Sequence, residues 1–156
     1  MIKIKRIALP ECYAHGNEVK AKEIYQYLRD NQRNYGNACA FVSDIEYDNF
    51  ILELQAQNIQ AQDDNYTILI NEVKDYQKNN VIYLQSFFGD IPYKIMDIIT
   101  QDNKTYAKVK PFENLRKKAV YINIPSQETV NQEIIKTLGL KGFEQYIKMV
   151  EYKGVK

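Results

Sequence analysis

Apolar and polar residues along the N-terminal part of the chain follow periods that predict a strand and then a helix. The opening run IKIKRIAL alternates apolar and basic residues, as a half-buried strand does, and Pro10 ends it. Apolar residues then recur at helical spacing over Glu18–Asp30, directly after Asn17, a residue type that favours helix N-caps. The run ACAFV predicts a short buried strand.

The pattern of the next segment predicts a second helix followed by an ambiguous stretch. Ser43 and Glu46 have the spacing of a capping box, and the apolar period after them predicts a helix that runs to about Gln62. Three polar residues at 63–65 predict a turn. Residues 66–76 fit either a strand, through the run YTILI, or a helix, through a longer apolar period, and the helix is preferred.

The second half of the chain changes to short β-prone runs. VIYLQSFF, YKIMDIIT, TYAKVK and KAVYINI are separated by turn-forming residues, which predicts an antiparallel meander over 81–124, with an SH3-like barrel as one candidate form. Ser126 then caps a helix that Gly139 ends, and a further apolar stripe predicts a helical pair over 126–151. The expected fold is a single α+β domain over 1–156, with a helical, acidic half over 1–80.

Composition excludes several kinds of active site. A single histidine, two cysteines and the absence of GxGxxG and GxxxxGK[ST] motifs argue against a multi-histidine metal centre and a phosphate-binding loop, so no cofactor is expected. No apolar segment has the length of a membrane span, so we expect a cytoplasmic protein without a membrane partner. The bias toward Ile, Lys, Asn and Tyr suggests a low-GC bacterium or its phages.

Charge is distributed unevenly although the net charge is only +1. Segment 44–75 holds eight carboxylates and one lysine, a formal charge of −7. Segment 104–118 holds six basic residues and one glutamate, a formal charge of +5. The two segments therefore predict two surfaces of opposite sign.

The acidic segment suggests a non-enzymatic protein that binds a basic partner. Such a surface could occupy the groove of a nucleic-acid-handling host enzyme, as phage or mobile-element inhibitors of the anti-CRISPR or anti-restriction type do; a merely solvated helix face is the alternative. The residues predicted to form this surface are Asp44, Glu46, Asp48, Glu53, Asp63 and Asp64.

The basic segment suggests a second function, direct binding of DNA or RNA. Lysines on a curved sheet beside aromatic rings can follow a phosphate backbone while bases stack on the rings, although alternation alone also places lysines on the wet side of a strand. The residues predicted for this interface are Lys104, Tyr106, Lys108, Lys110, Arg116, Lys117 and Lys118.

Catalytic candidates are weak. Asp64, Glu72 and Lys74 resemble the D…ExK arrangement of PD-(D/E)xK nucleases, which implies Mg²⁺ held by the carboxylates and a water positioned by the lysine. A continuous strand would separate the two carboxylates by about 26 Å, so only a tight reversal between them would form a site.

The cysteines give two further weak candidates. Cys39 and His15 could form a nucleophile and its base, and Cys12 with both of them would supply three zinc ligands. Reduced, partly buried thiols are the simpler expectation.

Overall fold

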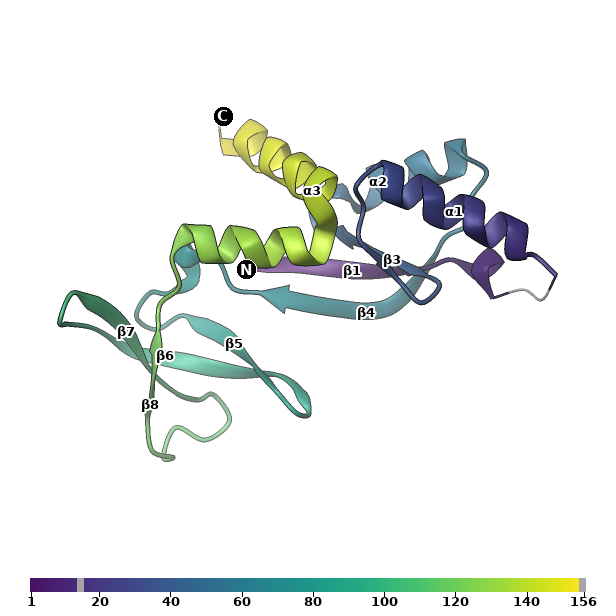
Figure 1. Ribbon diagram of the computed structural model, residues 1–156. Helices are drawn as coiled ribbons and strands as arrows, with labels where there is room; N and C mark the ends of the chain where they lie inside the picture. Colours follow the sequence, from purple (N-terminus) through teal and green to yellow (C-terminus); the bar gives the residue numbers. More distant parts are fainter. Residues whose placement is uncertain (14–15, 155–156) are drawn as a thin grey trace. The chain divides into compact units, whose positions relative to one another are not determined.

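The computed structural model describes residues 1–13 and 16–154, with side chains to residue 151. In this described part the chain has a mixed α+β structure with two antiparallel four-stranded sheets and three α-helices (Figure 1). It divides into two compact units. The meander unit contains residues 1–2 and 69–130, and the mixed unit contains residues 3–68 and the chain from residue 131 on.

The mixed unit combines a sheet in the order β2-β3-β1-β4 with helices. The predicted strands at the N-terminus and at ACAFV and the predicted helix over Glu18–Asp30 are confirmed. The elements are β1 (Ile2–Ala8), α1 (Glu18–Asp30), β2 (Tyr35–Gly36), β3 (Cys39–Ser43), α2 (Tyr47–Ala56), β4 (Gln62–Ile70) and α3 (Gln127–Gly154).

The core of this unit lies where α1 and α2 pack on one face of the sheet. Ile7 of β1 pairs with Ala40 of β3, and alternate residues of both strands point toward the helices. The periodic apolar residues of the helices complete a cluster that buries its side chains. Its buried members are Ile7, Leu9, Ile24, Leu28, Ala40, Val42, Phe50, Leu54 and Ile59.

The helix α2 ends at Ala56, earlier than the predicted end near Gln62. Asn58 adopts a left-handed conformation with φ of 57°. The N–H of Ile59 then donates to the carbonyl oxygen of Leu54 at 2.9 Å, the bond that closes a Schellman motif. Asparagine tolerates positive φ, so it stops the helix as a glycine would.

The predictions for residues 63–65 and 66–76 are wrong. One strand, β4, covers Gln62–Ile70, and the helix preferred for the second stretch does not form. The residues predicted to form a turn make only a local irregularity within this strand. Asn65 has φ of 55°, and its N–H donates to Asp63 Oδ1 at 2.8 Å. Pairing beside β1 in the sheet outweighs the weak helical period of the sequence.

The predicted caps differ in outcome. Ser43 Oγ accepts a hydrogen bond from Glu46 N at 3.3 Å, at a short 3₁₀ turn (Asp44–Glu46) that leads into α2. Ser126 Oγ accepts one from Thr129 N at 3.2 Å at the start of α3. Asn17 occupies the predicted N-cap position of α1, but its side chain makes no capping hydrogen bond.

The helix α3 is interrupted at Gly139, which has φ of 78° and ψ of 170° (Figure 1). Side chains on both sides of this residue are buried, among them Ile134, Leu138 and Tyr146. The interruption therefore changes the direction of α3, and the helical segments before and after it both bury apolar side chains.

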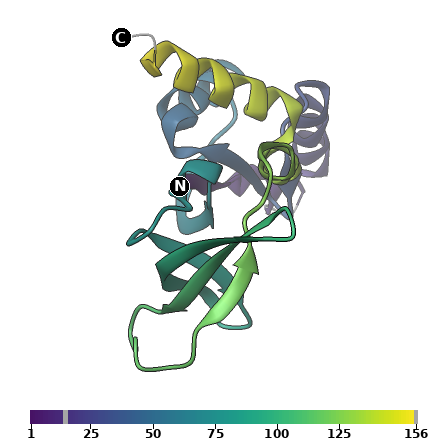
Figure 2. The ribbon, with the colours of Figure 1, turned by 90° about the vertical axis from the view of Figure 1, so that its left-hand side faces the viewer.

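The meander unit confirms the predicted antiparallel meander (Figure 2). The hairpin between β6 and β7 turns at Asp102 and Asn103, both at positive φ, as a type I′ turn requires. A small core of Ile82, Ile95, Ala107 and Val109 lies on one face of this sheet. The strands are β5 (Val81–Ser86), β6 (Gly89–Gln101), β7 (Lys104–Pro111) and β8 (Val120–Asn123), in that order.

Candidate functional site

Three of the six predicted surface carboxylates form ion pairs with basic residues of β1. Lys5 Nζ lies 3.8 Å from Asp44 Oδ1 and 3.7 Å from Asp63 Oδ2. Arg6 Nε donates to Asp64 Oδ2. Because Lys5 and Arg6 are neighbours on a strand, their side chains leave β1 on opposite faces, so Asp63 and Asp64 do not share one surface.

A fourth carboxylate, Glu53, belongs to a polar cluster between helices. Its Oε2 accepts from Arg33 Nη2 at 3.1 Å, and its Oε1 accepts from the Tyr27 hydroxyl at 2.8 Å. The Arg33 side chain is 1% exposed and its guanidinium lies 4.3 Å from the centroid of the Phe50 ring. Burial, followed by the hydrogen bond to Glu53, raises the pKa of Tyr27 to about 12. Glu53 therefore has a structural role.

The remaining two acidic candidates differ from each other. Glu46 is 6% exposed and lies in the 3₁₀ turn before α2. Asp48 is exposed and, within the part of the chain that the structure describes, forms no ion pair. The negative charge that the segment presents outward is thus smaller than its formal count, which weakens the argument for a basic partner. That function stays a prediction.

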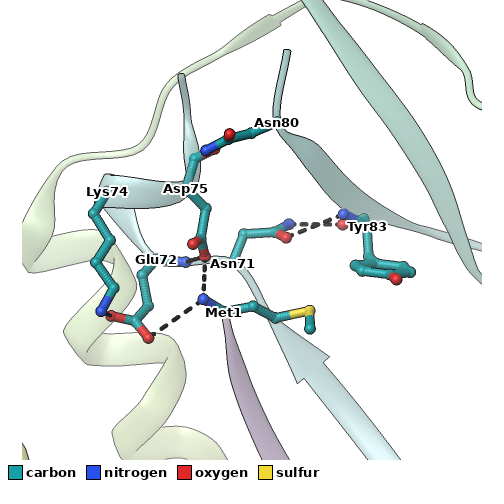
Figure 3. Close-up of polar contacts among 7 residues, drawn as sticks. All are labelled: Met1, Asn71, Glu72, Lys74, Asp75, Asn80 and Tyr83. Atoms are coloured by element: carbon teal, nitrogen blue, oxygen red, sulfur yellow. Dashed lines mark hydrogen bonds and ion pairs between the residues drawn. The ribbon is translucent and has the colours of Figure 1, made fainter. Parts of the chain in front are cut away.

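The candidate nuclease residues lie in different local environments. Asp64 lies within β4, and the strand continues beyond it without the reversal that a shared site requires. Glu72 Oε1 lies 3.5 Å from the Met1 amino group and Glu72 Oε2 lies 3.4 Å from Lys74 Nζ, while Asp75 Oδ2 lies 2.5 Å from the same amino group (Figure 3). No three metal-ligating side chains gather among residues 1–13 and 16–154.

The cysteine candidates are incomplete in the structure. Cys39 is buried at 8% exposure and Cys12 is half-buried, and both are free thiols. Burial raises the pKa of the Cys12 thiol, which makes it a poorer nucleophile. His15, the predicted base and zinc ligand, lies outside the described residues.

The basic candidates of β7 lie on the face of the meander opposite its core. Tyr106, Lys108 and Lys110 are partly exposed, and they alternate with the fully buried Ala107 and Val109. This alternation is what a half-buried antiparallel strand shows.

The registers of the neighbouring strands add charge and aromatic rings to the same face. Lys110 lies directly opposite Lys94 of β6, and Lys108 lies between Asp97 of β6 and Tyr121 of β8. Like charges in directly opposed positions destabilise a sheet. Within the described chain neither lysine of the opposed pair, nor Lys108, forms an ion pair.

These residues define a basic face. Residues two apart along a strand share a face, so Tyr83, two residues from Val81, which pairs with Lys94, also belongs to it. We use the name basic face for Tyr83, Lys94, Tyr106, Lys108, Lys110 and Tyr121. The sequence analysis missed Tyr83, Lys94 and Tyr121, and only the strand registers bring them to Lys108 and Lys110.

A loop at 112–119 continues the basic character beyond β7. Arg116, Lys117 and Lys118 are exposed, and Phe112 is 54% exposed. Phe112 N–H donates to Pro92 O at 3.1 Å, so the loop starts against β6.

The other candidate residue, Lys104, begins β7 at the opposite end. It lines an open groove of about 510 Å³ together with Asn103, Thr105, Asn123, Ile124 and Pro125. The groove is mainly polar and contains no carboxylate.

The edge strand β5 is partly covered by Asn71. Its Nδ2 donates to Tyr83 O at 2.7 Å, and its Oδ1 accepts from Tyr83 N at 3.0 Å (Figure 3). One side chain thus replaces a strand partner at the point where the basic face ends.

Comparison of the chain with protein-family models, curated proteins and solved structures finds no match. None of the helices in residues 1–13 and 16–154 has both the length and the apolar character that crossing a membrane requires.

Proposed function

We propose that this protein is a non-enzymatic nucleic-acid-binding module that holds a phosphate backbone on its basic face and the adjoining loop 112–119. The observation that carries the proposal is the direct opposition of Lys94 and Lys110 without a neutralising carboxylate. This arrangement costs stability in the free protein. An anionic polymer lying along the face would attract both lysines and would neutralise the charges that repel each other.

The tyrosines of the basic face supply the second part of a nucleic-acid interface. Tyr83, Tyr106 and Tyr121 lie on three different strands and flank the lysines. Aromatic rings beside cations on an antiparallel sheet can stack on bases while the cations contact phosphates. The interface is therefore expected to tolerate different base sequences.

The small net charge of the chain is compatible with this function, because ion pairs neutralise basic residues of the mixed unit more than those of the basic face. Lys5 and Arg6 form ion pairs with carboxylates of the mixed unit. Among the described residues the lysines of the basic face form no ion pair, and the one carboxylate directly opposite them in the sheet is Asp97, across from Lys108. A pI near 7.6 therefore does not measure the local potential of the face.

A salt series of binding measurements tests the proposal. A labelled oligonucleotide is titrated by fluorescence anisotropy with wild type and with the triple variant Lys94→Gln, Lys108→Gln, Lys110→Gln. We expect the triple variant to bind more weakly and to reduce the slope of log affinity against log salt by roughly 2, since fewer counterions are released.

The matched control removes three lysines of the mixed unit through Lys3→Gln, Lys20→Gln and Lys148→Gln. It changes the net charge equally and should leave both affinity and slope unchanged. Equal effects of the two triple variants, or no binding by wild type at low salt, would contradict the proposal.

The function predicted from the acidic segment remains a second proposal. Its remaining support is that Asp44 keeps 52% of its side chain exposed and that Asp48 is exposed. We propose in addition that the protein acts in the cytoplasm and that the meander curls toward an SH3-like barrel.

A further inference from the structure

Two consecutive phenylalanines form the tip of the hairpin between β5 and β6. Ser86 and Gly89 are the last paired residues, and Phe87 and Phe88 between them are 96% and 91% exposed. The two rings contact each other edge to face, with centroids 5.4 Å apart and planes at 85°. Large apolar side chains this exposed usually mark an interaction site.

The turn itself does not need these phenylalanines. Ser86 Oγ donates to Gly89 O at 2.8 Å and accepts from Phe88 N at 3.2 Å. Gly89 supplies the positive φ of 109° that the chain needs at this point. The side chains at positions 87 and 88 are therefore not required for the turn and are available for binding.

The strand registers connect the tip to the basic face. Pro111, the last paired residue of β7, lies opposite Tyr93, so the part of β6 before Tyr93 pairs with β5 alone. The hairpin thus extends beyond the end of β7 (Figure 1). Lys94 lies at the base of this arm, and the loop with Arg116, Lys117 and Lys118 starts beside it.

Because the exposed rings of the tip adjoin the basic face, we expect a ligand that combines negative charge with flat apolar surfaces. A strand whose phosphates follow the lysines of the basic face reaches the hairpin arm, where its bases meet the two rings. In a duplex the faces of the bases are already stacked on each other. Only unpaired bases offer free faces to Phe87 and Phe88.

We propose that the Phe87–Phe88 tip stacks on unpaired bases and that the ligand of the basic face is single-stranded nucleic acid. This inference rests on the proposed function and adds the class of nucleic acid and the residues that select it. The rings act by stacking, and the lysines act by binding phosphates.

The experiment compares three ligands with matched backbones. They are a labelled oligothymidine of about 12 nucleotides, the duplex it forms with its complement, and an abasic strand of the same length. Each is titrated with wild type and with the double variant Phe87→Ser, Phe88→Ser. The control variant Leu52→Ser replaces another exposed apolar residue, 63% exposed, in the mixed unit.

We expect wild type to bind the single strand more tightly than the duplex. The double variant should lose at least about 10-fold in affinity for oligothymidine, because each lost stacking contact weakens binding by roughly 5-fold or more and two rings are removed. It should bind the abasic strand as wild type does, with an unchanged salt slope. Its unfolding midpoint should not fall, since the rings pack on nothing else in the described chain.

Other results overturn the inference in distinguishable ways. Wild-type binding that the double variant retains in full removes the role of the tip and leaves the proposed function standing. An equal loss on the abasic strand rules out stacking. Phe-dependent binding to vesicles of phosphatidylserine and phosphatidylcholine, with unchanged binding to oligothymidine, assigns the tip to a lipid surface. No binding of wild type to any of the three ligands removes the proposed function as well.

Discussion

At the scale of single residues, Glu53 shows what a helical pattern can and cannot predict. The period of α2 correctly directs Phe50 and Leu54 into the core. The same period leaves Glu53 pointing outward, but Arg33 and Tyr27 from the region of α1 meet it there. Sequence spacing sets the direction of a side chain along its own helix, and it contains no information on which distant residue lies opposite.

The Tyr27 hydroxyl gives the chain a specific pH dependence. Its pKa is raised from 10.0 to about 12 by burial and by the hydrogen bond to Glu53, so the folded state favours the neutral phenol. This contribution to stability is complete below pH 10.0 and is lost as pH rises through about 12. We expect Tyr27→Phe to be less stable than wild type near neutral pH and to lose less stability between these two values.

Urea unfolding at a series of pH values measures this difference. Tyr13→Phe is the control, because Tyr13 is 60% exposed and should leave the wild-type pH profile unchanged. If the free energy of unfolding of Tyr27→Phe and of wild type changed in parallel with pH, the phenol of Tyr27 would not be the cause of the loss of stability at alkaline pH.

At the scale of elements, local signals predicted what local geometry determines. Asp102 and Asn103 both favour positive φ, so the turn between β6 and β7 could be placed before its strands were known. The strand β4 could not be placed in the same way. Its sequence fits two periods, and the choice depends on pairing with β1, which lies far away in the chain.

Gly139 is the residue on which the shape of α3 depends. Its φ of 78° and ψ of 170° lie in a region that only glycine adopts readily. A Cβ at this position would lie 2.1 Å from Gln32 O. We expect Gly139→Ala to lower the free energy of unfolding by more than about 3 kcal/mol, because backbone strain and a clash with fixed backbone add.

Gly16→Ala separates these two causes. Gly16 has φ of 86°, but apart from the glycine and its chain neighbours no atom of the described residues lies within 4 Å of the added Cβ. It should lose only the conformational part, about 1 kcal/mol. Chemical denaturation of both variants gives the comparison, and similar losses would mean that the contact between Gly139 and Gln32 does not matter.

At the scale of the whole molecule, the two charged segments are compensated differently. The formal −7 of residues 44–75 was counted within the segment, whereas Lys5, Arg6 and Arg33 from outside it neutralise much of that charge. The formal +5 of residues 104–118 is compensated less, because β6 brings one carboxylate, Asp97, opposite Lys108 and one further cation, Lys94, opposite Lys110. Counting along a sequence predicts a field only where the fold brings no opposite charge to it.

This difference predicts that one substitution in the basic face changes stability and binding in opposite directions. Lys110→Glu places a carboxylate directly opposite Lys94 and replaces a repulsive pair with an attractive one, which should add about 0.2 to 1 kcal/mol to the free energy of unfolding. The same change should weaken binding to a single-stranded oligonucleotide, because it removes a phosphate contact and adds a repulsive charge. Lys104→Glu makes the identical charge change on the same strand opposite the neutral Gln101, so it should weaken binding without the gain in stability. Urea unfolding and anisotropy titration of both variants measure the two effects, and a Lys110→Glu protein that is both less stable and equally competent to bind would show that the opposed lysines serve the fold and not a ligand.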